Sequence, residues 1–460
     1  MGTRPQLPGG PYLVVGLARS GVAAALALSV RGEQVIGVDS RALGEPRELR
    51  ELRERGVELH VAERGEDAVA LLERARTLVK SPGVPAQAPV VGEARARGMA
   101  VMGELELGWR LLPNEFIAVT GTNGKTTTVE LVAHILRGAR VGAAVAGNVG
   151  TALCSLVGAL APTDVIVCEV SSFQLEDALC FAPEAAVLLN LAPDHLDRHG
   201  SMPAYEAAKL RIFAAQPDRA VAVVPWALRE LIARAIAGAR TPERRVIRFG
   251  SDERAELYRR DGALWWQGEE VLGVAELRLR GAHNVENAMA AAAACLARGT
   301  PIEAVRDGLR SFAGVAHRLE EVATHAGLLY VNDSKATNVA STIVALESFA
   351  AEQRIHLILG GQGKGQDFSP LRAPVERACA AVYLIGEDAP AIARALEGVA
   401  PAVRVCGELE RAVSACARAA KAGEVVLLSP ACASFDQFAD FEARGERFRE
   451  LVDGLSGDGG

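Results

Sequence analysis

The chain has 460 residues, of which half are hydrophobic, and its formal net charge is −7. This length favours roughly three domains, each large enough to bury a core. Charged residues of both signs are spread along the chain, so no basic stripe indicates nucleic-acid binding and no polybasic cluster indicates a membrane surface. The N-terminus lacks a signal-peptide core, and no apolar run is long enough to span a bilayer. We therefore expect a cytoplasmic protein without nucleic-acid or membrane partners.

The eight cysteines are scattered along the chain, and none forms a Cys-x-x-Cys pair. Each has apolar or small neighbours in the sequence. This pattern is typical of buried, reduced thiols in a cytosolic protein, and not of a disulfide framework or a zinc site.

The first predicted unit, residues 12–39, has the order strand, glycine-containing turn, helix and strand. It approximates a dinucleotide fingerprint, with Asp39 where a ribose-binding acid belongs, but Ala18 replaces the middle glycine. A further strand enters a Ser-Pro-Gly turn within residues 77–84. Three interpretations stay open for this region: an NAD(P) site, a site for another nucleotide, or a βαβ unit that binds nothing.

The most informative motif lies at residues 115–128. An apolar strand is followed by Gly-Thr-Asn-Gly at 121–124, then by Lys125 and Thr126, and then by helical spacing. In this order, backbone N–H groups face phosphates, the lysine supplies a point charge and the threonine hydroxyl reaches Mg²⁺. The usual first glycine of the pattern is Val119 here. The strand before the turn and the helix after it therefore carry the prediction of a nucleoside triphosphate site.

Three later stretches of the central region offer metal ligands. Glu169 ends a predicted buried strand, where a second Mg²⁺ anchor is expected. Residues 194–199 place two acids and two histidines after another strand. Lys209 lies among small apolar residues of a predicted helix. From spacing alone, a structural acid remains an alternative for Glu169, and an ordinary helix lysine remains an alternative for Lys209.

The rest of the chain predicts another α/β region. A predicted helix from residue 281 carries His283, Asn284 and Asn287 near its start. Capping explains one of the asparagines, and the three residues together indicate an additional ligand role. Beyond residue 316, strands ending in polar or glycine-rich turns alternate with helices, which predicts a mostly parallel sheet. Between these regions, residues 248–250 and 263–266 are expected to be short antiparallel strands.

Together these motifs resemble the Mur ligases, ATP-dependent amide-bond-forming enzymes of peptidoglycan precursor synthesis. The resemblance rests on residues 121–126, Glu169, residues 190–195, Lys209, and residues 283–287, 317–318 and 332–338. Four stretches are similar to the family members that add D-glutamate, namely residues 171–175, 332–337, 360–364 and 429–438. The N-terminal region matches only through residues 16–21, Asp39 and residues 81–83.

The resemblance implies three α/β domains: a Rossmann-like domain at 1–103 for the UDP part of the substrate, a P-loop ATPase-type domain at 104–314, and a Rossmann-like domain at 315–460 for the amino acid. It implies a cytoplasmic monomer that uses ATP and two Mg²⁺ ions. It also implies that D-glutamate is joined to UDP-N-acetylmuramoyl-L-alanine through an acyl phosphate.

The same resemblance assigns individual residues. Catalytic roles fall to Lys125, Glu169, His195 and Lys209. The residues for ATP are Gly121, Thr122, Asn123, Gly124, Lys125, Thr126, Thr127, Asn284, Arg318 and Asp333. One Mg²⁺ is assigned to Thr126 and Glu169, and the second to His195 and carbamylated Lys209. The UDP part is assigned to Arg19, Ser20, Asp39, Ser40 and Ser81, and the muramoyl part to Asn148. The remaining substrate residues are Lys335, Thr337, Lys364, Ser434 and Phe441, of which the last four are assigned to the carboxylates of D-glutamate.

Three alternatives remain. A related ligase could add another amino acid or glutamate to folate, although the Ser-Pro-Ala-Cys-Ala-Ser stretch at 429–434 argues against it. An NAD-linked dehydrogenase would leave the phosphate loop and Glu169 unexplained. A non-enzymatic nucleotide switch predicts no phosphate release that depends on an amino acid.

Overall fold

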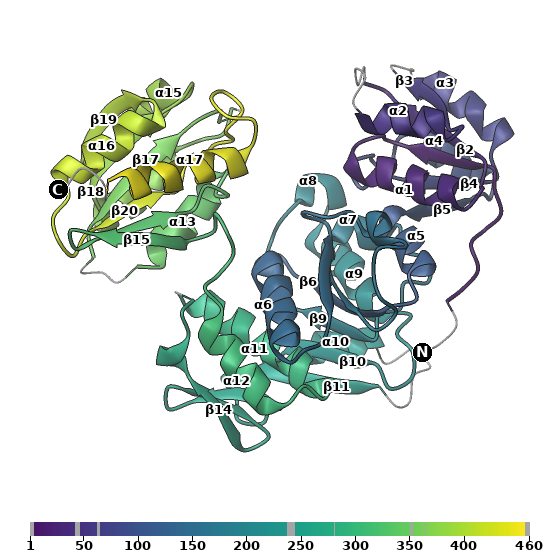
Figure 1. The fold of residues 1–460 in the computed structure, drawn as a ribbon, viewed down its shortest axis with the longest axis horizontal. Coiled ribbons are helices and arrows are strands. Elements are labelled where there is room, and N and C mark those ends of the chain that lie inside the picture. The colour runs from purple at the N-terminus through teal and green to yellow at the C-terminus, as the bar shows by residue number, and fades with distance from the viewer. Residues whose placement is uncertain are drawn as a thin grey trace. The chain divides into compact units, whose positions relative to one another are not determined.

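The computed structural model describes residues 4–41, 47–61, 65–236, 244–279, 281–349, 353–363 and 365–455, without the side chains of Glu66 and Asp197. The chain forms two compact units, and each is described by itself. Unit 1 is Met1–Glu276 with Glu286–Arg310, and unit 2 is Leu277–Val285 with Ser311–Gly460. Three sheets with flanking helices make up these units, so the predicted α/β fold class is confirmed (Figure 1).

The N-terminal sheet of unit 1 has the order β3-β2-β1-β4-β5, and all its strands are parallel. Its strands are β1 (Tyr12–Val15), β2 (Val35–Asp39), β3 (Glu58–Val61), β4 (Thr77–Lys80) and β5 (Ala100–Gly103). Its helices are α1 (Arg19–Val30), α2 (Arg47–Glu54), α3 (Gly65–Ala70), η1 (Leu71–Arg74) and α4 (Pro89–Ala96). The strand order reverses between β1 and β4, so a ligand crevice is expected at their carboxyl ends.

The second sheet of unit 1 has nine strands in the order β14-β13-β12-β11-β10-β9-β6-β8-β7. The strands are β6 (Glu115–Thr120), β7 (Ala143–Gly147), β8 (Val165–Glu169), β9 (Ala185–Leu188), β10 (Val221–Pro225), β11 (Arg245–Gly250), β12 (Leu257–Arg260), β13 (Ala263–Trp266) and β14 (Glu269–Gly273). The helices of this region are α5 (Glu104–Leu111), α6 (Lys125–Gly138), η2 (Leu153–Leu156), α7 (Ser172–Glu176), α8 (Leu196–His199), α9 (Met202–Leu210), η3 (Arg211–Phe213), η4 (Trp226–Leu228), α10 (Arg229–Ile236), η5 (Val274–Glu276), α11 (Ala282–Ala297) and α12 (Ile302–Ser311).

Residues 248–250 correct one prediction. They lie in β11, which pairs in parallel with β10 and β12, so the predicted antiparallel strand is wrong there. The strand β11 extends the parallel sheet beyond β10, which a short sequence window does not reveal. The prediction is confirmed for residues 263–266, since β13 is antiparallel to β12 and β14. Each of these hairpins turns through a residue and a glycine of positive φ, at Asp261–Gly262 and Gln267–Gly268.

Unit 2 contains a six-stranded sheet in the order β15-β16-β20-β17-β18-β19. Only β15 is antiparallel among its described strands, which confirms a mostly parallel sheet. The strands are β15 (Glu320–His325), β16 (Leu328–Asn332), β17 (Ile355–Gly360), β18 (Cys379–Ile385), β19 (Ala402–Gly407) and β20 (Val425–Leu428). The helices are α13 (Val339–Glu347), η6 (Ser369–Leu371), α14 (Arg372–Ala378), α15 (Ala389–Ala395), α16 (Leu409–Ala419) and α17 (Phe441–Gly454).

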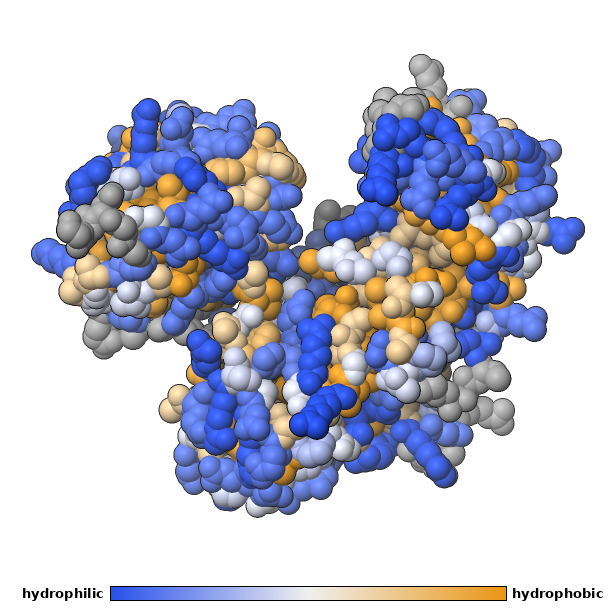
Figure 2. All heavy atoms as spheres, in the orientation of Figure 1, coloured by the Kyte–Doolittle hydropathy of each residue, from blue (hydrophilic) through white to orange (hydrophobic). Residues whose placement is uncertain are grey.

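The cysteines agree with the expectation of buried thiols at most positions. All eight cysteines are free, and six are buried, whereas Cys180 and Cys406 are only half-buried. No helix within the described ranges is long and apolar enough to cross a bilayer. Hydrophilic residues cover much of the face seen in Figure 2, and hydrophobic residues gather mainly on unit 1.

Candidate active site

The turn between β6 and α6 has the geometry of a phosphate-binding loop. Gly124 has a φ of +84° and precedes Lys125, the first residue of α6. A Cβ at Gly124 would lie 2.1 Å from the Asn287 side-chain oxygen, so only glycine fits. The Lys125 ammonium donates to the carbonyls of Gly121 (2.9 Å) and Thr122 (2.8 Å). Lys125 and Thr126, which precede the apolar helical spacing in the sequence, already belong to the first turn of α6.

Asn190, the second residue after β9, holds the loop from the side. Asn190 accepts from the Asn123 backbone N–H (2.9 Å) and donates to the Asn123 carbonyl (3.2 Å). The hydroxyls of Thr122 and Tyr205 lie 3.0 Å apart. Val119 is fully buried inside β6, so the absent first glycine is a core strand residue and does not disturb the turn.

A hydroxyl and a carboxylate meet beside the loop. Thr126 Oγ1 donates to Glu169 Oε2 (2.8 Å), and the Asn148 amide donates to Glu169 Oε1 (3.1 Å). Glu169 ends β8 and is 2% exposed. These hard oxygen atoms fit Mg²⁺, which binds through one or two protein oxygens together with phosphates and water. Within the described residues, no group of three or more His, Cys, Asp and Glu side chains could hold a metal alone.

Lys209 lies buried against the same loop. It is 2% exposed, and its Nζ donates to the Gly121 carbonyl (2.8 Å) and lies 4.7 Å from the centre of the Tyr205 ring. Burial, and next the charge of Lys125, lower the pKa of Lys209 to about 7. A substantial fraction is therefore a neutral amine near neutral pH, the form that can add CO₂. The structure thus provides the chemical condition for carbamylation.

The predicted acid and histidine cluster at 194–199 divides into two parts. His195 caps α8 with a φ of +51°, its side chain is 51% exposed, and its Nε2 lies 3.5 Å from Asp194 Oδ2. His199 instead lies 3.0 Å from Ser172 Oγ through Nε2 and 3.0 Å from Glu176 Oε1 through Nδ1. His199 therefore joins α8 to α7, and the side chain of Asp197 lies outside the described residues.

The candidate UDP residues occupy the carboxyl edge of the N-terminal sheet. Ser81 Oγ donates to the Gly16 carbonyl (2.6 Å), and the Asp39 carboxylate accepts from the backbone N–H groups of Leu17 and Arg41. Burial alone would raise the pKa of Asp39, but hydrogen bonds from Arg41 and these N–H groups bring it below its ordinary value. The partner Arg41 was not predicted from the sequence. The remaining candidates lie at the same edge. Arg19 and Ser40 are exposed, and Ser20 is half-buried.

The candidate nucleotide residues of unit 2 lie in three places. Arg318 precedes β15, Asp333 follows β16, and Asn284 belongs to the first turn of α11. Asp333, which follows β16, accepts from Ser429 Oγ (2.8 Å) and the Leu319 N–H (3.2 Å), and burial raises its pKa to about 7. The Arg318 Nε is buried and has no hydrogen-bond partner among the described residues. Asn284 is 8% exposed.

The candidate amino-acid residues of unit 2 cluster around the start of α17. The Phe441 carbonyl accepts from Ser334 Oγ (2.8 Å), and Lys335 Nζ lies 5.5 Å from the centre of the Phe441 ring. Ser434 is 2% exposed, and Thr337 is half-buried. Lys364 lies outside the described residues.

Arg444 is a residue of this cluster that sequence reasoning missed. It is 1% exposed and donates to Ser334 Oγ, to the Ser334 carbonyl and to the carbonyls of Cys432 and Ala433. Burial lowers its pKa to about 10, so it stays charged. Arg444 therefore fixes the segments that follow β16 and β20. The sequence around Arg444 does not indicate this role, because an arginine in an amphipathic helix normally faces solvent.

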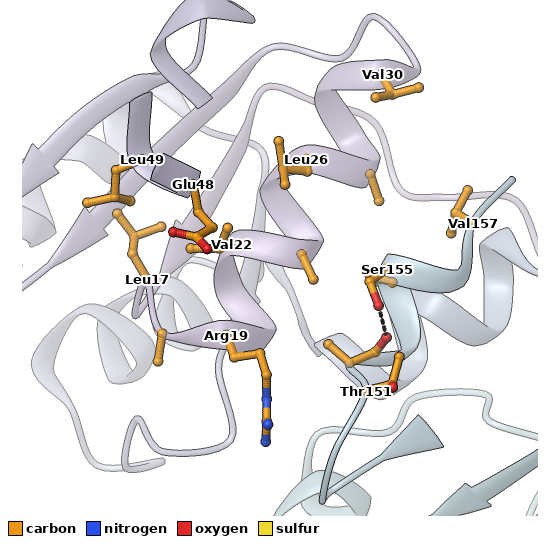
Figure 3. A pocket seen from close by; sticks show the side chains of 15 residues that line it. Leu17, Arg19, Val22, Leu26, Val30, Glu48, Leu49, Thr151, Ser155 and Val157 are labelled. Atoms are coloured by element: carbon orange, nitrogen blue, oxygen red, sulfur yellow. Dashed lines mark hydrogen bonds between the residues drawn. The ribbon is translucent and has the colours of Figure 1, made fainter. Parts of the chain in front are cut away.

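A large cavity in unit 1 is not the candidate active site. It has a volume of about 720 Å³ and lies between α1 and η2, with mostly apolar walls (Figure 3). Of the candidate site residues, only Arg19 lines it.

Glu104 is a buried acid near this cavity that the sequence analysis did not single out. It is the first residue of α5 and is 1% exposed, and its Oε1 accepts from the Cys154 N–H (2.6 Å). Its Oε2 has no hydrogen-bond partner within the described part of the chain. Burial raises the pKa of Glu104 to about 7, against hydrogen bonds from Cys154 and the charge of Arg19.

The stability of the Glu104→Gln variant should rise relative to that of wild type as pH rises, because wild type loses stability over this range. The fold holds the Glu104 proton more tightly than the unfolded chain, whose ordinary pKa is 4.5. The contribution of the protonated carboxyl is full below that value and is lost as pH rises through 7. The amide stays neutral, so denaturation at about pH 5 and pH 8 should show the variant gaining on the order of 2 kcal/mol relative to wild type.

Glu106→Gln is the matched control, because Glu106 is equally buried but its carboxylate accepts from Arg110 and from the Leu179 and Cys180 N–H groups. This variant should lose stability at both pH values. A stability difference for Glu104→Gln that does not change with pH would contradict the assignment.

Family models match three successive stretches of the chain. The "MurD-like, N-terminal domain" of Mur ligases matches residues 11–103, the "Mur ligase middle domain" matches 119–295, and the "Mur ligase, glutamate ligase domain" matches 317–432. The protein is also 43% identical to the UDP-N-acetylmuramoylalanine--D-glutamate ligase of Acidobacterium capsulatum over 97% of both chains.

The chain belongs to the Mur ligase family. The ligase with the same name from Anaeromyxobacter dehalogenans is 44% identical over 97% of this chain and 98% of its own. Solved structures of Mur ligases share the fold at low identity. MurF from Acinetobacter baumannii gives a TM-score of 0.60 at 17% identity, covering 98% of this chain and 94% of its own. MurC from Thermotoga maritima gives 0.57 at 20% identity, covering 97% of this chain and 100% of its own.

Proposed function

We propose that this Mur ligase adds D-glutamate to UDP-N-acetylmuramoyl-L-alanine in the cytoplasm, using ATP and an acyl-phosphate intermediate. The observation that carries the proposal is the match, over nearly the full length of both chains, to ligases named for this reaction. The phosphate loop, the Thr126–Glu169 contact and the buried Lys209 support it with chemistry.

Three domains would divide the work. Residues 1–103 would bind the UDP part through Arg19, Ser20, Asp39, Ser40 and Ser81. Residues 104–314 would bind ATP, and Asn148 would contact the muramoyl part. Residues 315–460 would bind D-glutamate through Thr337, Lys364, Ser434 and the Phe441 backbone, and Lys335 would also contact the substrate. Asn284, Arg318 and Asp333 would complete the ATP site, and the enzyme would act as a monomer.

In the first step, an oxygen of the L-alanyl carboxylate attacks the γ-phosphorus of ATP, and ADP leaves. The turn N–H groups and Lys125 neutralise charge on the phosphates, so the residues contribute mainly positioning and electrostatics. Thr126 and Glu169 would hold Mg²⁺, which neutralises the developing phosphate charge when bound.

Lys209 has a second role in the proposal. Its neutral amine would add CO₂ to give a carbamate, a carboxylate-like ligand that would hold a second Mg²⁺ together with His195. The pKa of about 7 supports this assignment, because an amine with the ordinary lysine pKa of 10.5 would be almost wholly protonated at neutral pH.

In the second step, the nitrogen of D-glutamate attacks the acyl carbon. The tetrahedral intermediate collapses, and phosphate leaves with the carboxylate oxygen that attacked ATP. One proton is lost from the amine as the amide bond forms. The side chains assigned to D-glutamate would orient this amine by binding both carboxylates.

The proposal is tested by phosphate release from ATP in the presence of UDP-N-acetylmuramoyl-L-alanine and one amino acid. D-glutamate should support release, whereas L-glutamate and meso-diaminopimelate should give only background. Release that depends on diaminopimelate would favour a related ligase. Amino-acid-independent release would contradict ligase activity of this chain.

A further inference from the structure

Unit 1 contains a fully buried ion pair that joins its two sheets. Lys80 ends β4 of the N-terminal sheet and is 0% exposed. Its Nζ lies 2.7 Å from Oδ2 of Asp177, whose side chain is 2% exposed. Asp177 follows α7 of the second sheet region. Since neither charge can reach water, each depends on the other's position, and moving them apart would leave a buried charge uncompensated.

Further contacts hold both ends of this pair. The Lys80 ammonium also donates to the Val84 carbonyl (2.8 Å), which closes the turn that begins at Ser81. Arg95 of α4 contacts the other Asp177 oxygen at 3.2 Å, and the Gly103 N–H donates to the Asp177 carbonyl (3.3 Å). The pair is therefore part of a fixed junction and not an isolated contact.

The turn at one end of the junction carries a candidate substrate residue. Ser81 follows Lys80 directly, and its hydroxyl donates to the Gly16 carbonyl (2.6 Å) in the first glycine turn. A Cβ at Gly16 would lie 2.8 Å from Val84, so the two turns are in close contact. Displacing the Lys80 ammonium would therefore disturb both turns to which the UDP part is assigned.

The segment at the other end begins at the candidate metal ligand. Glu169 ends β8, and Ser171 caps α7 in a capping box with Gln174 before the chain reaches Asp177. A second link supports the same junction, because Arg198 of α8 donates to the Pro82 carbonyl (3.4 Å). The turn at 81–84 is thus tied to the segments that follow β8 and β9.

We propose that Lys80 and Asp177 are positioning residues that set the distance between the UDP-binding turns and the phosphate-transfer centre. This inference rests on the proposed function. A substrate that runs from a uridine diphosphate at one sheet to a carboxylate at the other must span that distance. An ion pair that holds the two sites at this distance would favour binding of the long substrate. It would contribute little to the binding of UDP alone, which occupies only one of the two sites.

The test compares two ligands of different length by calorimetry. The variant Lys80→Met removes the charge and keeps a similar chain length. It should bind UDP within about twofold of wild type but UDP-N-acetylmuramoyl-L-alanine at least about tenfold more weakly. Equal loss for both ligands would indicate damage to the UDP turns alone, and no loss for either would show that the pair does not position the substrate. Both results would overturn the inference.

A double variant separates positioning from stability. Lys80→Met alone leaves Asp177 charged and unpaired in the interior, so its Tm should fall. Lys80→Met/Asp177→Asn should recover much of the Tm, since no unpaired buried charge remains, while the weak binding of the long substrate persists. Recovery of that binding together with the Tm would overturn the inference.

Arg110→Met is the matched control. Arg110 and Glu106 form an equally short buried pair (2.7 Å, side chains 6% and 0% exposed), but both residues belong to α5. This variant should lose stability without a selective loss of affinity for the long substrate. A selective loss of affinity equal to that of Lys80→Met would overturn the inference.

Measurements on the wild type distinguish failure of this inference from failure of the proposed function. If wild type binds UDP but not UDP-N-acetylmuramoyl-L-alanine, the proposed function fails and the inference with it. If wild type binds both and Lys80→Met does too, only the inference fails.

Discussion

Replacing Lys209 with alanine should nearly abolish ligation. The variant loses the amine that would carry the carbamate and with it one ligand of the second Mg²⁺. A catalytic metal contributes several kcal/mol to the transition state, so kcat should fall on the order of a thousandfold. The measurement is D-glutamate-dependent phosphate release at saturating ATP, with the fold checked by circular dichroism.

Added short carboxylic acids should partly restore this activity. Formate or acetate can enter the space left by the lysine side chain and place a carboxylate where the carbamate is proposed. Lys209→Arg is the control, because arginine keeps the positive charge but stays protonated and fills the space. It should be inactive and unresponsive to acids. Full activity of Lys209→Ala without additives would contradict the assignment of a carbamate to Lys209.

The second large effect is expected for Gly124→Ala. The new Cβ would lie 2.1 Å from the Asn287 side-chain oxygen, and the residue would have to keep a φ of +84°. Relieving the clash moves the loop whose N–H groups are assigned to the phosphates. ATP affinity, measured by fluorescence titration with a labelled nucleotide, should fall by about a hundredfold or more.

Gly98→Ala separates strain from steric fit. Gly98 has a φ of +69°, but a Cβ there meets no atom within 4 Å. This variant should lose about 1 kcal/mol of stability and keep its ATP affinity. Normal ATP binding by Gly124→Ala would contradict the assignment of this loop, whatever its effect on Tm.

Local chemistry explains which parts of the site could be predicted. Glu169 ends one apolar strand and the phosphate loop follows another, and parallel strands bring their carboxyl ends to one edge, so their proximity follows from the sequence pattern. The burial of Lys209 follows from its small apolar neighbours, and its low pKa follows from that burial.

Other features depend on partners far away in the sequence. His199 looked like a metal ligand beside His195, but Ser172 and Glu176 occupy both of its ring nitrogens. The burial of Arg444 and of Lys80 depends on segments about a hundred residues away, and short-range periodicity carries no information on these contacts. The parallel pairing of β11 with β10 also lies beyond a short sequence window, because paired residues such as Val221 and Arg245 are 24 positions apart.

The fate of one oxygen atom tests the central proposal most directly. UDP-N-acetylmuramoyl-L-alanine labelled with heavy oxygen in the alanyl carboxylate is incubated with ATP, D-glutamate and the enzyme, and the released phosphate is analysed by mass spectrometry. If the carboxylate attacks the γ-phosphorus, each phosphate released should carry one oxygen from the substrate. Phosphate that takes its oxygen from water instead would show that the γ-phosphate goes to water, and would contradict the proposed ligase mechanism.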